Sequence, residues 1–275
     1  MSPSAETPAG IQAVALRLLA ERTEGVTPRA LAGLLAATYG RSRRWGRSAV
    51  GALVAAGELA YREQHGHTIL EPSFDRPVRL SPRVVVAPPE AACVSRPGEV
   101  VVRLAHGASF GTGQHPTTRL SVQGIDAALG GLVVTHRGAE TAVLDVGTGS
   151  GILAITALML GIGRGVAVDI DPCAVAEARG NAALNGLSGR LLIGALPVEE
   201  IRGEFALITA NLRFPTLRRI LPEMLRRSAP RAAWVISGIR GEEMRPLREQ
   251  YEALGLSCCW QAEEKDWAAL VVQVP

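Results

Sequence analysis

The sequence has few of the residues that form disulfide or metal scaffolds. Its four cysteines show no C-x-x-C spacing, and the adjacent pair Cys258 and Cys259 cannot easily bridge itself. This pattern excludes a disulfide framework and predicts reduced, buried thiols in a cytosolic protein. His65 and His67 alternate like two residues on one face of a strand, but no further ligands accompany them. We therefore expect no metal site.

Long hydrophobic runs are absent as well. The most apolar stretch, residues 151–163, is too short to cross a bilayer and is interrupted by glycine. Residues 1–10 have neither the basic start nor the apolar stretch of a signal peptide. We expect a soluble, cytoplasmic protein that has no membrane partner.

Neither sign of charge is in large excess. The 29 basic and 26 acidic residues leave a formal net charge of +3, and Lys265 is the only lysine. So small a net charge does not by itself indicate a protein that binds nucleic acid or a membrane surface. With 275 residues the chain can form one large domain or two smaller ones.

Residues 1–77 show the pattern of a small helical domain. Apolar residues recur at helical spacing over residues 11–19, and Thr27 precedes a proline as an N-cap residue precedes a first helical turn. The pattern predicts helices over residues 11–19, 28–40 and 43–56, and strands over residues 58–63 and 68–71. Three helices and a β-wing outline a winged helix-turn-helix-like domain.

Four arginines lie at the start of the third predicted helix, where such folds often meet DNA or RNA. They are Arg41, Arg43, Arg44 and Arg47. Acidic residues of the same region nearly offset them, and winged helices also serve as protein-docking modules. Both nucleic acid and protein therefore stay open as partners of residues 1–77.

The rest of the chain has the pattern of an α/β domain. Prolines are frequent between Pro72 and Pro89, so we expect residues 78–105 to be a connector, with one short strand favoured at residues 84–86. Residues 106–275 alternate apolar strands with helical segments. The expected strands are residues 142–146, 165–168, 191–193, 205–210, 232–237, 256–261 and 267–274. This order predicts a doubly wound, Rossmann-like sheet, open and mostly parallel, with helices on both faces.

A glycine-rich motif, D-V-G-T-G-S-G at residues 145–151, follows the first of these strands directly. Its glycines, Gly147, Gly149 and Gly151, allow a sharp turn and let a ligand lie against bare backbone. Asp169 ends the next strand, where a carboxylate can accept hydrogen bonds from both ribose hydroxyls.

Glycine spacing separates two kinds of nucleotide cofactor. A dinucleotide fingerprint, G-x-G-x-x-G/A, would place its third small residue at position 152, which is Ile152. The G-x-G-x-G spacing, with Asp145 two residues before it, instead suits S-adenosylmethionine, whose ammonium group Asp145 could hold directly or through water. The alternative is a glycine-rich turn without a ligand.

Asn211 follows the fourth strand and is expected to face the crevice where open α/β sheets bind ligands. Its amide oxygen could accept a hydrogen bond from an attacking amine and orient the nitrogen lone pair. The alternative is that Asn211 only caps the local backbone.

Four motifs together resemble the PrmA family, the ribosomal protein L-eleven methyltransferases. They are F-G-T-G-Q-H-P-T-T at residues 110–118, D-V-G-T-G-S-G-I-L-A-I at 145–155, V-D-I-D-P at 168–172 and A-N-L at 210–212. A late acidic pair before Trp267 also resembles the family's C-terminal end. The similarity extends over residues 100–274, and the first motif is far more specific than a lone glycine loop.

The resemblance implies a role for two groups of residues. The positions implied to bind S-adenosylmethionine are Thr118, Gly147, Asp169 and Asn211. Those implied to line the methyl-transfer site are Phe110, Gly111 and Thr112.

Two departures separate this chain from the family pattern. Residues 104–107 are L-A-H-G where the family has L-D-P-G, and residues 1–75 do not resemble the family's α/β substrate-recognition domain. The resemblance implies methyl transfer to amine groups of a protein, possibly a ribosomal one. The alternatives are a nucleic-acid or small-molecule acceptor, and a regulator that uses the winged domain and keeps the pocket only as a sensor.

Overall fold

The computed structural model describes residues 6–22, 25–64, 66–105, 107–134 and 138–275. His65 and His106 therefore lie outside the described residues. The chain divides into two compact units, Met1–Arg76 and Pro77–Pro275.

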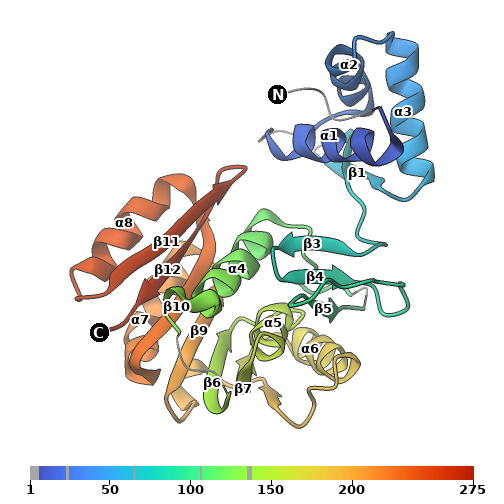
Figure 1. Cartoon of the computed structure of the whole chain (residues 1–275). Coiled ribbons are helices and arrows are strands. Elements are labelled where there is room, and N and C mark those ends of the chain that lie inside the picture. The colour runs from blue at the N-terminus through green and yellow to red at the C-terminus, as the bar shows by residue number, and fades with distance from the viewer. Residues whose placement is uncertain (1–5, 23–24, 65, 106, 135–137) are drawn as a thin grey trace. The chain divides into compact units, whose positions relative to one another are not determined.

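The first unit consists of three helices and a hairpin, in the order predicted (Figure 1). Its elements are α1 (Pro8–Ala20), α2 (Pro28–Thr38), α3 (Arg43–Ala55), β1 (Leu59–Gln64) and β2 (His67–Pro72). Each helix begins at a hydroxyl N-cap, because Thr7, Thr27 and Ser42 accept a backbone N–H three residues ahead. Leucine and valine side chains from all three helices and both strands form one buried cluster in this unit.

The second unit is built on a seven-stranded sheet with the order β11-β12-β10-β9-β6-β7-β8. Its strands are β6 (Gly138–Val146), β7 (Ile162–Val168), β8 (Leu191–Gly194), β9 (Phe205–Asn211), β10 (Ser228–Arg240), β11 (Ser257–Glu264) and β12 (Trp267–Gln273). The first five pair in parallel and the terminal hairpin β11–β12 is antiparallel. The predicted Rossmann-like sheet is therefore confirmed.

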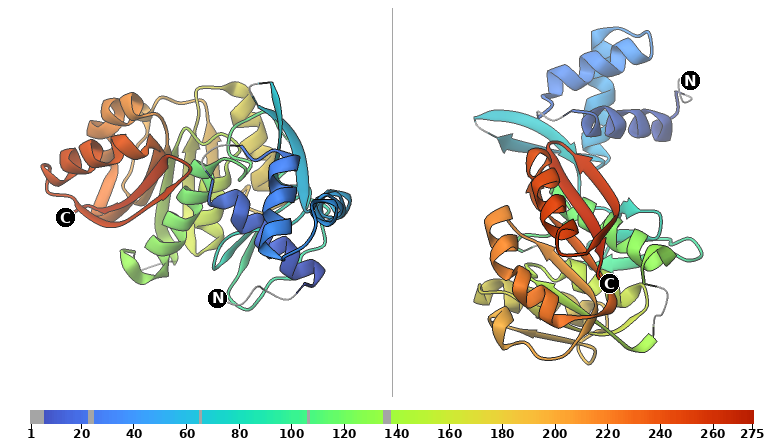
Figure 2. Two further views of the ribbon diagram at one scale, coloured as in Figure 1. Left: turned by 90° about the horizontal axis from the view of Figure 1, so that it is seen from above. Right: turned by 90° about the vertical axis from the view of Figure 1, so that its left-hand side faces the viewer.

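Helices cover both faces of this sheet, as predicted (Figure 1; Figure 2). They are α4 (Pro116–Ala127), α5 (Ile152–Met159), α6 (Pro172–Leu184), α7 (Phe214–Arg227) and α8 (Gly241–Glu252). On one face, α7 and α8 share a buried cluster with alternate strand residues such as Leu144 and Ile236. On the other face α4 lies so close that a Cβ at Gly124 would be 2.8 Å from Val235.

Residues 78–105, expected to be a connector, instead contain a second small sheet of the same unit. Its strands are β3 (Val78–Ser81), β4 (Val84–Ala87) and β5 (Val100–Arg103), in the order β3-β4-β5. All four residues of β4 are buried, and the sheet contacts α4 and α5. Four-residue strands carry little periodic signal, so the prolines around them dominated the sequence pattern.

The expectation of buried thiols is wrong. All four cysteines are free, but Cys173 is exposed and the other three are half-buried. Cys173 lies in the first turn of α6, on the side that faces solvent. Among the described residues no group of three or more His, Cys, Asp or Glu could hold a metal ion. No described helix is long and apolar enough to span a membrane.

A glycine pair in α3 offers a test of how the first unit packs. A Cβ at Gly46 would lie 2.0 Å from the carbonyl oxygen of Ala32 in α2, whereas a Cβ at Gly51 would have no neighbour within 4 Å. We expect Gly46→Ala to lower the free energy of unfolding by about 1–3 kcal/mol through overpacking. Gly51→Ala should raise it by about 0.5–1 kcal/mol, because alanine is the better helix former. Urea unfolding measures both, and equal effects would contradict the close α2–α3 approach.

Candidate functional site

The glycine loop, residues 147–151, lies at the carboxyl end of β6. Gly147, Gly149 and Gly151 have φ values of +72°, +54° and +86°, a left-handed region that favours glycine. The N–H groups of Gly147 and Thr148 donate to the carbonyl of Val168 at 2.9 and 3.0 Å, which ties the loop to the end of β7. The predicted sharp turn is therefore present.

The same glycines also allow close contacts within the protein. A Cβ at Gly147 would lie 2.5 Å from the side chain of Leu212, and a Cβ at Gly149 would lie 2.3 Å from the carbonyl oxygen of Phe110. Both distances are shorter than real Cβ contacts, so neither position accepts alanine without movement. The sequence pattern indicated a sharp turn and close approach of a ligand at these glycines, and it missed their part in packing within the protein.

Asp169 lies beside the loop, directly after β7. Its Oδ2 accepts the N–H of Gly149 at 2.9 Å, and its Oδ1 accepts the N–H of Asp171 at 3.0 Å. These bonds orient a half-buried carboxylate whose oxygens can each accept a further hydrogen bond. The side chain of the neighbouring Ile170 is 92% exposed.

Asp145, predicted to hold a ligand's ammonium group, is completely buried under the loop. Its Oδ2 accepts the hydroxyl of Thr148 and its Oδ1 accepts that of Thr209, each at 2.6 Å. Burial raises the pKa of the Asp145 carboxyl from its ordinary value near 3.8 to about 6, against the opposing effect of the two hydroxyls. The carboxyl therefore supports the loop from beneath, and its contact with a ligand stays a prediction.

The signature segment, residues 110–118, lies against the glycine loop. The backbone N–H of Ser150 donates to the carbonyl of Phe110 at 2.9 Å, and its hydroxyl donates to the carbonyl of Gly111 at 2.8 Å. Gly111 has a φ of +106°, Thr112 is half-buried, and the Phe110 side chain remains 52% exposed. Phe110 and Gly111 are thus brought together with the glycine loop, although they are distant from it in sequence.

Thr118 lies in the first turn of α4 and is fully buried. Within the part of the chain that the structure describes, its hydroxyl has no hydrogen-bond partner, and neither has that of Ser109. An unsatisfied buried hydroxyl costs about 1–3 kcal/mol, which a polar ligand atom could offset. The Thr118 hydroxyl is therefore one buried polar group with which a ligand atom could pair.

Asn211 is the last residue of β9 and is half-buried. The next residue, Leu212, contacts Gly147 of the glycine loop and donates its N–H to Ser237 at 3.1 Å. No hydrogen bond involves the Asn211 side chain among the described residues, so the structure gives no support to a local cap. The amide is available at the same edge of the sheet as the glycine loop.

Two rings of the signature segment and one ring of the terminal hairpin lie close together. The ring centroids of Phe110 and His115 are 5.1 Å apart, and those of His115 and Trp267 are 4.9 Å apart. The guanidinium of Arg240 lies 3.9 Å from the Trp267 ring centroid, within cation–π range. Sequence reasoning noted Trp267 but missed Arg240, which no local pattern connects to it.

A second link joins the signature segment to the terminal hairpin. The guanidinium of Arg119 bonds the carboxylate of Glu264, and it also donates to the carbonyls of Gly113 and Gln114. Both charged side chains are at least four-fifths buried, with 18% and 20% exposure. Glu264 belongs to the acidic pair that the sequence matched to the family's C-terminal end.

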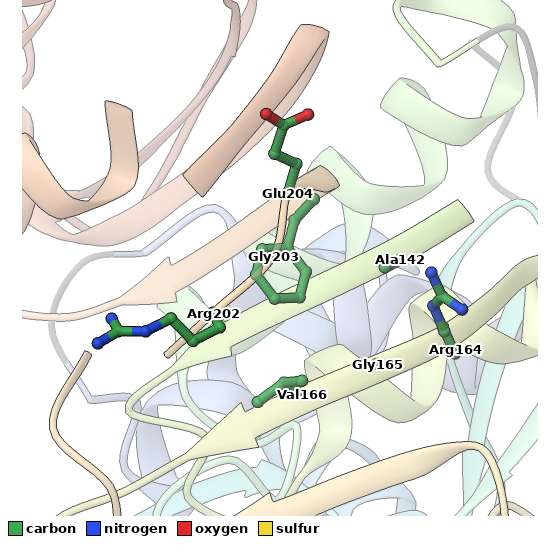
Figure 3. Close-up of a pocket in the computed structure, with 8 residues that line it drawn as sticks. Ala142, Arg164, Gly165, Val166, Arg202, Gly203 and Glu204 are labelled. Carbon is green, nitrogen blue, oxygen red and sulfur yellow. The ribbon is translucent and has the colours of Figure 1, made fainter. Parts of the chain in front are cut away.

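A separate pocket of about 170 Å³ lies away from these motifs. Figure 3 shows it between Arg164 of β7 and Arg202 of the loop before β9, with Val166 between them. Its other lining residues include Ala142, which lies within β6, and Phe205, which is the first residue of β9. The glycine loop and Asp169 follow the carboxyl ends of β6 and β7, and Asn211 is the last residue of β9, so the pocket is not part of the candidate site.

The strand order and the motifs at the carboxyl ends of the strands together define a Rossmann-like fold of the class I methyltransferase type. A solved structure described as a ribosomal protein L11 methylase from Lactobacillus delbrueckii subsp. bulgaricus matches with a TM-score of 0.63 and 27% identity. The match covers 72% of this chain and 97% of that one.

Sequence comparison gives the family. The model of PrmA, the ribosomal protein L11 methyltransferase, matches residues 71–275, and the chain belongs to this family. Curated L11 methyltransferases from Pelobacter propionicus and Geobacter metallireducens are 37% and 36% identical over 71% and 72% of this chain. The matched region spans 62% of the length of each of these two relatives.

The buried carboxyl under the loop predicts a pH dependence of stability. The folded-state pKa of Asp145, about 6, lies above its ordinary value of 3.8, so the folded protein binds this proton more tightly than the unfolded chain does. The resulting stability is complete below about pH 4 and is lost as the pH rises through about 6.

Asp145→Asn removes this titration while keeping a side chain that can bond both threonine hydroxyls. The free energy of unfolding of the wild type minus that of the variant should fall by roughly 2 kcal/mol between pH 4 and pH 7. Urea unfolding at the two pH values measures it. An identical difference at both would show that the carboxyl titrates normally.

Proposed function

We propose that the chain transfers a methyl group from S-adenosylmethionine to amine groups of a protein acceptor, and that the acceptor is a ribosomal protein. One observation carries the proposal: Ser150 bonds the signature segment to the glycine loop, beside the carboxylate of Asp169. Support for the acceptor comes from the relatives, which are named ribosomal protein L11 methyltransferases.

The residues at the site fit this cofactor. The carboxylate of Asp169 can accept hydrogen bonds from ribose hydroxyls, and the exposed side chain of Ile170 offers an apolar surface to an adenine ring. The buried hydroxyl of Thr118 can bond a polar atom of the cofactor and so gain the partner it lacks among the described residues. When bound, the cofactor supplies a methyl group on a positively charged sulfur, which is a good leaving group.

The residues of the chain would then act mainly by alignment, which is an effective way to accelerate a displacement. The amide oxygen of Asn211 accepts a hydrogen bond from the acceptor amine and orients its lone pair toward the methyl group. The amine must first lose a proton, against an ordinary pKa of about 10.4, and burial lowers that value. The rings of Phe110, His115 and Trp267 form a wall that excludes water from the amine.

The proposal assigns no single catalytic base. The Nδ1 atom of His115 is held at the start of α4, 2.8 Å from the Thr117 hydroxyl, and its ring lies between two others. A methyltransferase of a ribosomal protein would act in the cytoplasm, so this location is part of the proposal.

The first unit is proposed to select the acceptor, since residues 1–70 lie outside the family match. In this unit the guanidinium of Arg41 forms two hydrogen bonds with the carboxylate of Glu6. This ion pair partly neutralises the arginine cluster, for which the sequence left both nucleic acid and protein open as partners. The relatives described above are named for methylation of a ribosomal protein, which favours a protein partner for this unit.

Two aspartates beside the loop allow a matched test of cofactor binding. Asp169→Asn should raise the Kd of S-adenosylhomocysteine at least about tenfold, because it removes a charge-assisted bond worth about 1.5–3 kcal/mol. Asp171→Asn makes the same chemical change two residues away and keeps a good N-cap for α6, so its Kd should stay within about twofold of the wild type. Calorimetry decides, and equal effects would remove Asp169 from the site.

Asn211 tests the transfer step. Asn211→Ala should lower the turnover number by at least about tenfold while changing the cofactor Kd less than about threefold, as expected for an interaction favoured in the transition state. The assay uses radiolabelled S-adenosylmethionine and ribosomal proteins. Parallel losses of binding and turnover would make Asn211 a cofactor ligand.

The same label identifies the acceptor class. Incubation of the wild type with a whole-cell lysate should place the label in protein. Label in RNA or in small molecules would contradict the proposed acceptor. Tight cofactor binding with no label transferred would favour the regulatory alternative.

A further inference from the structure

One face of α6 carries a row of polar side chains that faces the chain leading into the signature segment. Glu177 and Asn181 lie four residues apart on α6, and Asn185, the C-cap residue of that helix, follows after four more residues, so the three lie above one another. All three bond backbone atoms of residues 103–109. Side chains of the row therefore hold the backbone of this segment at Arg103, Ala105, Ala108 and Ser109.

The first two contacts fix the start of the segment. Asn185 accepts the N–H of Arg103 at 2.9 Å and donates to its carbonyl at 2.7 Å. Asn181, which is 3% exposed, accepts the N–H of Ala105 at 2.9 Å and donates to the carbonyl of Ser150 at 2.8 Å. Asn181 thus contacts both the approach to the signature segment and the glycine loop.

Glu177 makes the last contact before the signature segment. Its carboxylate accepts the N–H of Ala108 at 2.9 Å and that of Ser109 at 3.0 Å. A Cβ at Gly107 would lie 2.2 Å from Glu177 Oε2, so a larger residue at this position would require the carboxylate to move. Two N–H donors converge on one anion, an arrangement that favours a carboxylate over a neutral amide.

Phe110 follows Ser109 directly, so its backbone is held from two directions. Glu177 fixes the N–H groups of the two preceding residues, and Ser150 binds the carbonyl of Phe110 itself. Because the Phe110 ring is half-exposed, packing around the ring does not define its position fully. The hydrogen bonds to the backbone of residues 108–110 must therefore define much of the position of Phe110.

We propose that Glu177, supported by Asn181, is a positioning residue that holds residues 108–112 over the cofactor and acceptor site. It acts through the backbone of Ala108 and Ser109 and needs no contact with cofactor or acceptor. Its role rests on the proposed function, because the ligand that it helps to align is S-adenosylmethionine. Pre-ordering a binding segment raises affinity by reducing the entropy lost on binding.

The test compares Glu177→Ala, Glu177→Gln and Asn185→Ala with the wild type, all as the full chain. Asn185→Ala is the matched control, because it breaks bonds from the same helix to Arg103, before the signature segment. Two quantities are measured: amide hydrogen exchange of residues 103–112 without ligand, and the Kd of S-adenosylhomocysteine by calorimetry.

We expect Glu177→Ala to accelerate exchange of the Ala108 and Ser109 amides by about tenfold or more, since their acceptor is lost. It should raise the Kd at least about fivefold through lost pre-ordering. Glu177→Gln keeps the length and one acceptor oxygen, so it should restore part of both properties, and it carries the test if the alanine variant does not fold. Asn185→Ala should accelerate exchange near Arg103 and leave the Kd within about twofold.

Unchanged exchange at residues 108–112 in Glu177→Ala would overturn the proposal. So would equal increases in Kd for Glu177→Ala and Asn185→Ala, which would indicate general loosening of α6. A wild type that does not bind S-adenosylhomocysteine would instead contradict the proposed function. The exchange comparison, made without ligand, would still decide whether Glu177 orders the segment.

Discussion

Two hydrogen bonds from Ser150 join parts of the site that lie 39 residues apart in sequence. Its N–H and its hydroxyl bind the carbonyls of Phe110 and Gly111, and its own carbonyl accepts the amide of Asn181. Ser150 therefore connects the glycine loop, the signature segment and α6 at one point.

The junction depends on the absence of a side chain at Gly149 as well as on the hydrogen bonds of Ser150. Gly149 has no Cβ, so the carbonyl of Phe110 can approach the loop to bond Ser150. Under the loop, Asp145 accepts hydroxyls from Thr148 within the loop and from Thr209 in β9. The carboxyl thus fixes the loop relative to the strand that carries Asn211, while its burial raises its pKa to about 6.

Local patterns account for much of the fold and of the site. Proline at N1 after Thr27 predicted α2, and apolar runs predicted the strands of the large sheet, because both signals depend on neighbouring residues only. The sheet of residues 78–103 was missed, since strands of four residues become stable only when β4 is buried against other elements. The burial of the cysteines was misjudged for the same reason: composition does not say which side of α6 Cys173 faces.

The sequence by itself determined the Rossmann-like order of elements, the loop that turns at Gly147 and the presence of Asp169 and Asn211 at the carboxyl ends of their strands. These properties follow from spacing along the chain and from the conformations that each residue type allows. Only the tertiary structure decided that Asp145 is enclosed by two hydroxyls and that Glu177 holds the approach to Phe110. Such contacts join residues far apart in sequence, and their existence depends on how the helices pack against the sheet, which spacing along the chain does not encode.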